Sequence, residues 1–208
     1  MGLGRRYAGR DGFVRPVELL TTRVTSLEMS AEAHRARVRV AARRDDLRVD
    51  EVPRLPLERY RELYVAVGAA HHWTSRLLPD RALADEIHNP RTRIYLASLG
   101  HETAGWFEIE VKRMARSARI VHFAILPGFR GRGLAGPVFE EAIAAGFAEG
   151  PERVTIETNT LDHPAALGLY RKHGFVPYAT REVRTPSFQS YEMRQAASAG
   201  AISSNSTG

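Results

Sequence analysis

Apolar residues recur along the chain with two different spacings, and these spacings predict a mixture of strands and helices. Intervals of three and four residues predict helices over residues 57–69, 79–87, 134–147 and 164–173. Alternating or short continuous apolar runs predict strands over residues 23–29, 37–41, 93–98, 103–112, 119–126, 153–158, 175–183 and 188–193. The last two are expected to close the fold as a strand pair. This order of elements is typical of a mixed α/β domain.

The length of the chain limits how many domains it can form. Its 208 residues suit one well-buried domain and are short for two. Residues 1–20 are basic and Gly-rich, and we predict a flexible N-terminal segment there. A single domain is expected over residues 21–195. The Ser/Ala/Gly-rich residues 196–208 are predicted to form a disordered tail.

Composition narrows the chemistry that the chain can perform. It has no cysteine, which excludes disulfides, thiolate metal sites and cysteine nucleophiles. No stretch has the apolar core of a signal peptide or the length of a membrane span, so we expect a cytoplasmic protein with no membrane partner. The net charge of +6, carried mostly by arginine, suits an anionic ligand. Because no basic block is interleaved with aromatic residues, nucleic-acid binding is not expected.

The most informative local feature is the glycine-rich segment Arg130-Gly131-Arg132-Gly133-Leu134-Ala135. It lies between the predicted strand 119–126 and the predicted helix 134–147. Glycines let several backbone N–H groups point inward, and the start of a helix adds partial positive charge. Arginine side chains can add charge-assisted hydrogen bonds. The segment therefore predicts a phosphate-binding loop, with an ordinary strand-to-helix turn as the alternative.

A second motif follows about thirty residues later, and the pair resembles one enzyme family. The spacing Arg130-x-x-Gly133-x-Ala135 resembles the acyl-CoA pyrophosphate loop of the GCN5-related N-acetyltransferases (GNAT). Residues 166–175, Ala-Leu-Gly-Leu-Tyr-Arg-Lys-His-Gly-Phe, resemble the second signature of that family. The resemblance covers residues 92–194. It implies an α/β (mixed α+β) acyltransferase fold, whose mostly antiparallel central sheet is splayed at the cofactor cleft and flanked by helices.

The resemblance also implies which residues contact acetyl-CoA or another acyl-CoA. These are Ile125, Leu126, Arg130, Gly131, Arg132, Gly133, Leu134, Ala135, His163 and Ala166. Backbone N–H groups near Ile125 and Leu126 are the expected donors to the oxyanion. His163 stands where asparagine is common in the family.

Tyr170 matches the family tyrosine that lies near the sulfur of CoA. Proton transfer from a phenol of pKa ~10 to a thiolate of pKa ~8.5 is uphill by about 2 kcal/mol, so a hydrogen bond alone can suffice. The alternative role is a tyrosine packed in the core with its hydroxyl at the rim.

The general base is harder to place, because the family glutamate position falls on Arg119, which cannot accept a proton. We rank Glu108 first, since strand alternation puts it on one face with Glu110. His122 is second, because imidazole titrates near neutral pH, although a satisfied core histidine is equally consistent with the sequence. Glu110, Glu157 and an ordered-water relay are also candidates.

Residues 71–76, His-His-Trp-Thr-Ser-Arg, lie between the two predicted N-terminal helices. In the family this region lines the acceptor site, so Trp73 and Glu157 are predicted to bind the acceptor. Trp73 can stack on an apolar or cationic substrate or pack the helix pair. Adjacent histidines cannot converge on one metal from a helix, so we predict no metal.

Together these observations predict an acyl-CoA-dependent N-acyltransferase. The expected reaction is direct attack of the primary amine of a small molecule on acetyl-CoA, through a tetrahedral intermediate. A protein lysine or an N-terminal amine is the alternative acceptor. A catalytically inactive acyl-CoA-binding module is the alternative from another class. The sequence leaves a homodimer open.

Overall fold

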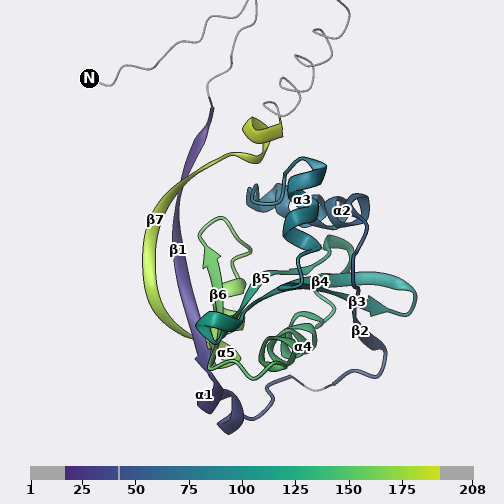
Figure 1. Ribbon diagram of the computed structural model, residues 1–208, viewed down its shortest axis with the longest axis vertical. Helices are drawn as coiled ribbons and strands as arrows, with labels where there is room; N and C mark the ends of the chain where they lie inside the picture. Colours follow the sequence, from purple (N-terminus) through teal and green to yellow (C-terminus); the bar gives the residue numbers. More distant parts are fainter. Residues whose placement is uncertain (1–16, 42, 193–208) are drawn as a thin grey trace, which may run out of the picture.

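The computed structural model describes residues 17–41 and 43–192. Seven strands form one sheet in the order β2-β3-β4-β5-β6-β1-β7 (Figure 1). The strands are β1 (Leu19–Ser30), β2 (Leu47–Glu51), β3 (Thr92–Leu99), β4 (Glu102–Lys112), β5 (Ser117–Ile125), β6 (Arg153–Asn159) and β7 (Val176–Pro186). The α-helices are α1 (Ala31–Ala36), α2 (Leu57–Gly68), α3 (Asp80–Ile87), α4 (Ala135–Phe147) and α5 (Ala166–Lys172). Short 3-10 turns are η1 (Ala69–His71), η2 (Arg113–Ala115) and η3 (Pro127–Phe129).

Helices cover both faces of this sheet, which confirms the predicted fold class. Helix α4 lies on the opposite side of strands β3–β5 from α2 and α3 (Figure 1). The α4-side core includes Phe107, Ile120, Phe139 and Ile156. The α2-side core includes Tyr60, Leu63, Leu83 and Trp106. Each face of the sheet therefore buries its own apolar cluster against the helices that cover it.

Strands β5 and β6 form the one parallel pair in this sheet, and they separate soon after they meet. Pairing runs from Ser117 opposite Arg153 to Ile120 opposite Ile156 and then stops. The remainder of β5 continues along β4, and the remainder of β6 continues along β1. This divergence opens the gap that the sequence predicts for the cofactor.

A β-bulge in β5 sets which side chains face each layer. Glu108 pairs with His122, but the next residue, Ile109, pairs with Ile120, so Val121 has no partner on β4. Such an extra residue shifts the alternation of the strand by one position. Ile120 therefore packs in the α4-side core, whereas Ala124 packs in the α2-side core. His122 shares the face of Ala124.

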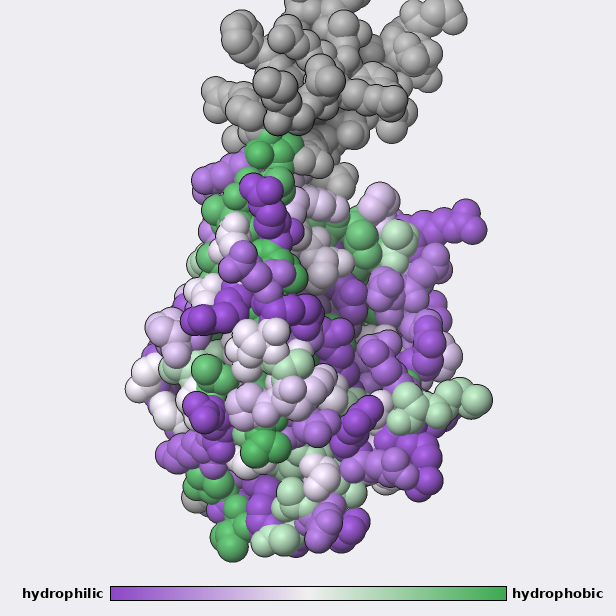
Figure 2. Space-filling model, turned by 90° about the vertical axis from the view of Figure 1, so that its left-hand side faces the viewer, coloured by the Kyte–Doolittle hydropathy of each residue, from purple (hydrophilic) through white to green (hydrophobic). Residues whose placement is uncertain are grey.

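The N-terminal strand β1 lies between β6 and β7, so the ends of the described chain lie side by side. Ser187 N–H donates to Glu18 O at 2.9 Å. Strand β7 is the exposed edge, and Figure 2 looks onto this side, where hydrophilic and apolar residues are mixed over the surface. The predicted strand pair of 175–183 with 188–193 is wrong, because β7 pairs with β1.

Residues 188–192 form a helical turn instead of the predicted strand. The Ser187 side chain accepts from Ser190 N–H at 3.3 Å, and Tyr191 N–H donates to Ser187 O at 3.1 Å. These local bonds cap and begin a helix, as serine favours at an N-cap. Residue 193 lies outside the described residues.

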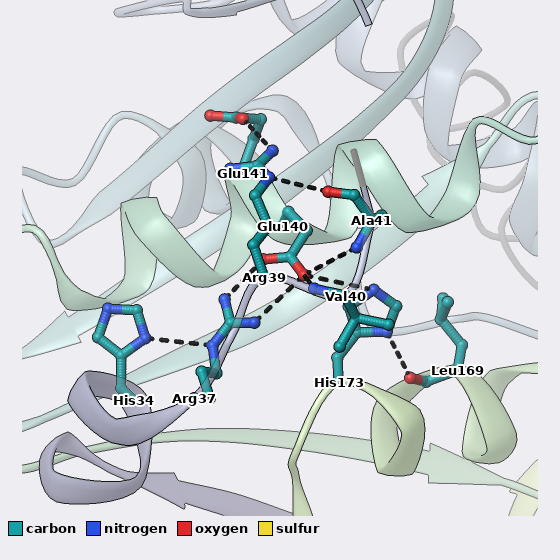
Figure 3. Close-up of polar contacts among 9 residues, drawn as sticks. All are labelled: His34, Arg37, Arg39, Val40, Ala41, Glu140, Glu141, Leu169 and His173. Carbon is teal, nitrogen blue, oxygen red and sulfur yellow. Dashed lines mark hydrogen bonds and ion pairs between the residues drawn. The ribbon is translucent and has the colours of Figure 1, made fainter. Parts of the chain in front are cut away.

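The strand predicted over residues 37–41 is also wrong, because this segment binds a helix rather than another strand. The buried Glu140 carboxylate of α4 accepts from Arg37 Nη2 at 2.6 Å and from Val40 N–H at 2.8 Å (Figure 3). His173, at the end of α5, lies with its Nε2 3.7 Å from Glu140 Oε1. The Val40 N–H, which a strand would use for pairing, thus donates to the Glu140 carboxylate instead. This contact holds residues 37–41 against α4.

The other predicted elements are confirmed, with small differences at their ends. The structure adds α1 and β2, which the sequence analysis missed. Of the predicted flexible segment 1–20, residues 1–16 lie outside the described residues, whereas Leu19 and Leu20 belong to β1 rather than to a flexible segment. The predicted tail 196–208 also lies outside the described residues. Among the described helices, none is long and apolar enough to cross a membrane.

Candidate active site

A cleft of about 560 Å³ lies where β5 and β6 diverge. Most residues predicted from the sequence line it, although they come from widely separated segments. They are Trp73, His122, Ile125, Arg130, Gly131, Gly133, Leu134, Ala135, Glu157, His163, Ala166 and Tyr170. Glu108, Leu126 and Arg132 are not among the lining residues.

The glycine-rich loop has the geometry of an anion site. Gly131 and Gly133 have φ angles of +74° and +72°, and no atom lies within 4 Å of a Cβ built on either. These positive angles favour glycine and turn the backbone between β5 and α4. No side chain caps the first turn of α4, so its N–H groups are left to bind a ligand. The cradle therefore fits a diphosphate.

The two arginines of the loop differ in their placement. Arg130 lines the cleft, and its Nε donates to Ile125 O at 3.2 Å. The Arg132 guanidinium lies 4.8 Å from the centre of the Phe129 ring, and its backbone oxygen accepts from Arg44 at 2.8 Å. The Arg132 side chain therefore packs against Phe129 and does not line the cleft, and its predicted cofactor contact stays a prediction.

The backbone at the end of β5 offers one of the two predicted oxyanion donors. Leu126 N–H donates to Ala104 O at 2.9 Å, so it is not available to a ligand, and the prediction for Leu126 needs this correction. Backbone N–H groups alternate in direction along a strand, so Ile125 N–H points away from β4. That direction is toward the gap between β5 and β6.

Tyr170 is buried at the inner end of the cleft, with 6% of its surface exposed. Its ring stacks on Phe139, with centroids 4.9 Å apart. Burial, with a smaller effect of the Asp162 charge, raises the pKa of the Tyr170 hydroxyl well above its usual value. The hydroxyl therefore stays protonated at physiological pH and can donate a hydrogen bond.

His122 and Glu108 form a directly bonded pair across β5 and β4. His122 Nδ1 lies 3.0 Å from Glu108 Oε2, and His122 Nε2 lies 3.5 Å from the Ser75 hydroxyl. An ionised carboxylate can only accept, so Nδ1 carries the proton. In neutral imidazole Nε2 then holds the lone pair, which can accept a proton and faces the Ser75 hydroxyl, and His122 lines the cleft.

The Glu108 carboxylate is fully buried and bound by two further donors. Tyr60 Oη donates to it at 2.7 Å and Arg76 Nη2 donates at 2.6 Å. Burial alone would raise the pKa of Glu108, but His122 and Arg76 outweigh it and lower the pKa to about 2. A carboxylate with this pKa holds a proton poorly at neutral pH, although it can orient the imidazole.

The α2–α3 loop, residues 69–79, bridges to the far side of the cleft. His71 Nδ1 lies 3.0 Å from Leu161 O, and Trp73 Nε1 donates to Asp162 Oδ1 at 2.8 Å. The Trp73 and His122 rings lie 5.3 Å apart. Trp73 thus forms a wall next to His122, consistent with a place in the acceptor site.

Glu157 lies on β6, just beyond the last residue that pairs with β5. Its carboxylate binds Arg119, Arg181 and Ser26. The arginines and the serine lower the pKa of Glu157 despite partial burial. Both of its oxygens are engaged, so it offers little to an incoming proton.

Four further residues of the site were not identified from the sequence, namely Tyr60, Ser75, Arg76 and Asp162. Tyr60 is one of the regularly spaced residues on the apolar face of the helix predicted over residues 57–69. This spacing predicts that Tyr60 packs in the core, and it does not indicate a hydrogen bond to a carboxylate. Arg76 and Ser75 lie in the segment 71–76, but no local pattern links them to β4. Among the described residues, no group of three or more His, Cys, Asp or Glu side chains is arranged to hold a metal ion.

Sequence comparison shows a relationship of the chain to an acetyltransferase. The chain is 27% identical over 113 residues to a putative [ribosomal protein bS18]-alanine N-acetyltransferase of Bacillus subtilis (strain 168), covering 54% of this chain and 73% of that protein.

Two solved structures share the fold. A spermidine N-acetyltransferase from Vibrio cholerae, solved with CoA and spermine, is 18% identical with a TM-score of 0.54, covering 71% of this chain and 99% of that one. A GCN5-related N-acetyltransferase from Sphaerobacter thermophilus is 16% identical with a TM-score of 0.57, and the match covers 83% of this chain. The chain spans about half, 52%, of the length of the Sphaerobacter protein.

The family comparison covers more than half of the chain. Residues 57–175 match the acetyltransferase (GNAT) family. This range includes the glycine-rich loop, the His122–Glu108 pair and Tyr170. The chain therefore belongs to the GNAT acetyltransferase family.

Proposed function

We propose that this protein transfers the acetyl group of acetyl-CoA to the primary amine of a small molecule. The observation that carries the proposal is the orientation of His122. Its Nδ1 is held by Glu108, so Nε2 is left as a base in the same cleft as the glycine-rich loop and Tyr170. Acetyl-CoA, when bound, supplies an activated acyl thioester.

We assign the proton acceptor to His122 rather than to Glu108. An alkyl ammonium of pKa ~10 must lose its proton before it can attack, and the imidazole of His122 lines the cleft with Nε2 as an acceptor for that proton. Glu108 is buried and does not line the cleft. Its pKa is lowered to about 2, so its carboxylate is ionised at neutral pH. Glu108 therefore acts as a positioning residue that fixes the imidazole tautomer and stabilises its protonated form.

The chain's other groups suit the remaining steps. Ile125 N–H is directed to donate to the oxygen of the carbonyl under attack. In this proposal Tyr170, protonated because burial raises its pKa, donates to the leaving thiolate. Gly131, Gly133 and the start of α4 bind the diphosphate. His163 and Ala166 line the same cleft on the α5 side.

The N-terminal amine of a protein is a second candidate acceptor. The observation that favours it is the similarity to the Bacillus subtilis protein, which is named for acetylation of an alanine of ribosomal protein bS18. A peptide and a small amine would meet the same base, so the two acceptors differ only in what surrounds the amine.

A thiol-release screen tests the proposed function. The full chain is incubated with acetyl-CoA and either small primary amines or peptides with free N-termini, and CoA release is measured. We expect release with small amines, which depends on His122. Release with peptides alone would favour the second candidate. Acetyl-CoA binding by calorimetry without release for any amine or peptide would favour an inactive binding module instead.

A further inference from the structure

A network of two arginines and one glutamate lies where the parallel strands separate. Glu157 on β6 accepts from Arg119 on β5 at 3.1 Å and from Arg181 on β7 at 2.7 Å and 3.1 Å. Ser26 on β1 donates to the same carboxylate at 2.7 Å. The network therefore joins four strands, and Arg119 and Glu157 line the cleft.

The charges in this network do not cancel. Two guanidinium groups share one carboxylate, which leaves a net charge of +1 on these three side chains. Arg119 uses only Nη2 on Glu157, and within the described part of the chain its Nε and Nη1 make no hydrogen bond. The side chains of Arg119 and Arg181 are 35% and 52% exposed. Arg119 thus holds free donors that are accessible from the cleft.

Arg119 lies on the same strand as the proposed base. The bulge at Val121 puts Arg119 and His122 on the same face of β5, and a strand rises ~3.3 Å per residue. Their Cα atoms are therefore roughly 7–10 Å apart. This spacing allows one short molecule to place an amine at His122 and an anionic group at Arg119.

We infer that Arg119, held in place by Glu157, binds a carboxylate of the acceptor, so that the acceptor is a short amino acid. This inference rests on the proposed function and names the substrate class of the same site. A guanidinium fork matches a carboxylate with two parallel N–H donors. Because Glu157 already orients the Arg119 side chain, binding of the acceptor costs less side-chain conformational entropy.

The engagement of the cleft carboxylates by protein donors also distinguishes this cleft from one that takes polyamines. Spermidine carries several ammonium groups, and a site for it needs uncompensated carboxylates. Glu157 is fully engaged by its arginine and serine partners, and Asp162 is engaged by Trp73, Thr158 and Asn159. A simple strand-linking role for Arg119 is the competing explanation.

Matched acids and amides distinguish these explanations. Thiol release from acetyl-CoA is measured with glycine, β-alanine and γ-aminobutyrate, and with the amide of each. Wild-type protein should prefer an acid over its amide by roughly 10- to 100-fold in kcat/KM, the range of a charge-assisted hydrogen bond. Arg119→Gln should remove this preference, mainly by raising KM for the acid, and Arg119→Lys should restore part of it. Arg23→Gln, which removes one charge from the outer face of β1, should leave the preference unchanged.

Several results would overturn the inference. If Arg119→Gln leaves the acid-to-amide ratio of kcat/KM, the rates and Tm as they are in wild type, the inference is rejected and the proposed function stays intact. Equal loss for acids and amides in Arg119→Gln, together with a lower Tm, would assign Arg119 to strand linkage. Because an acid and its amide differ in amine pKa, the deciding quantity is the change in their ratio between wild type and variant at one pH. No release with any amine would reject the proposed function, and this inference with it.

Discussion

His122 and Glu108 face each other across β5 and β4, with Nδ1 and Oε2 3.0 Å apart. Their alignment depends on Val121, whose bulge turns His122 to the α2-side face where Glu108 lies. With regular alternation, His122 would share the face of Ile120 and pack against α4. One extra residue in β5 therefore creates the proposed base and its positioning partner.

Replacement of Glu108 by Gln should change both activity and stability. Without the negative charge, protonated His122 is less favoured, so the acidic limb of the pH–kcat/KM profile should move to lower pH and the rate should fall by roughly 10-fold or more. Arg76 would lose its buried counter-charge and keep the half-exposed Glu86, so the cost should be at most about 3–5 kcal/mol. Kinetics and urea unfolding measure the two effects.

Glu110→Gln is the matched control for this change, because Glu110 lies on the same face of β4 and, among the residues that the structure describes, forms an ion pair with Lys112 alone. It should leave the profile unchanged. If Glu110→Gln moved the acidic limb and Glu108→Gln did not, the positioning role of Glu108 would be wrong.

Tyr170→Phe should lower kcat by roughly 10- to 1000-fold, from the loss of one hydrogen bond up to the loss of full acid catalysis. The phenylalanine ring keeps the stack on Phe139, so KM for acetyl-CoA and Tm should change little. Single-turnover kinetics should locate the effect in the chemical step. An unchanged single-turnover rate would assign Tyr170 to core packing alone.

Gly133→Asp should weaken acetyl-CoA binding, because its carboxylate would occupy the anion site. Gly133→Asn is the control, since Asn and Asp tolerate a positive φ similarly and differ in charge. We expect Asp to raise Kd by roughly 10- to 100-fold over Asn, the range of a charged hydrogen bond. Calorimetric titration of the folded variants measures this difference, and equal affinities would exclude a phosphate at the loop.

Stability should fall at acidic pH, in part through Glu108. Its pKa is lowered from 4.5 to about 2 in the folded protein, so the ionised group stabilises the fold above about pH 4.5. That contribution, about 3 kcal/mol, is lost as the pH falls toward 2. The free energy of unfolding should therefore decline less steeply between pH 6 and pH 3 in Glu108→Gln than in wild type. Parallel declines would place the stabilising charge elsewhere.

The sequence predicts the elements whose signals are local. Helical spacing and the glycines locate α4 and its loop, and the motif at 166–175 locates α5 and Tyr170. Segment 37–41 was misassigned, because its alternating apolar residues resemble a strand while its backbone donors bind the distant Glu140. Residues 188–192 were misassigned for a similar reason, since the Ser187 cap outweighs the strand propensity of the aromatic residues.

The site could be predicted only in part, because its key pairings are non-local. The order of Glu108 before His122 followed from residue type and alternation alone. Neither signal reports the bulge at Val121, nor that Tyr60 and Arg76 bind the Glu108 carboxylate. The role of Arg119 likewise depends on Arg181, which lies 62 positions later and reaches Glu157 through the pairing of β1 with β6 and β7.

The pH–kcat/KM profile of His122→Asn tests the central claim most directly. Asparagine keeps an N–H donor for Glu108 but cannot accept the amine proton. With the best amine found, we predict that the variant binds acetyl-CoA like wild type, loses roughly 100- to 10,000-fold in rate and no longer shows the acidic limb of the wild-type profile. A variant with the wild-type rate and the wild-type profile would show that His122 is not the base.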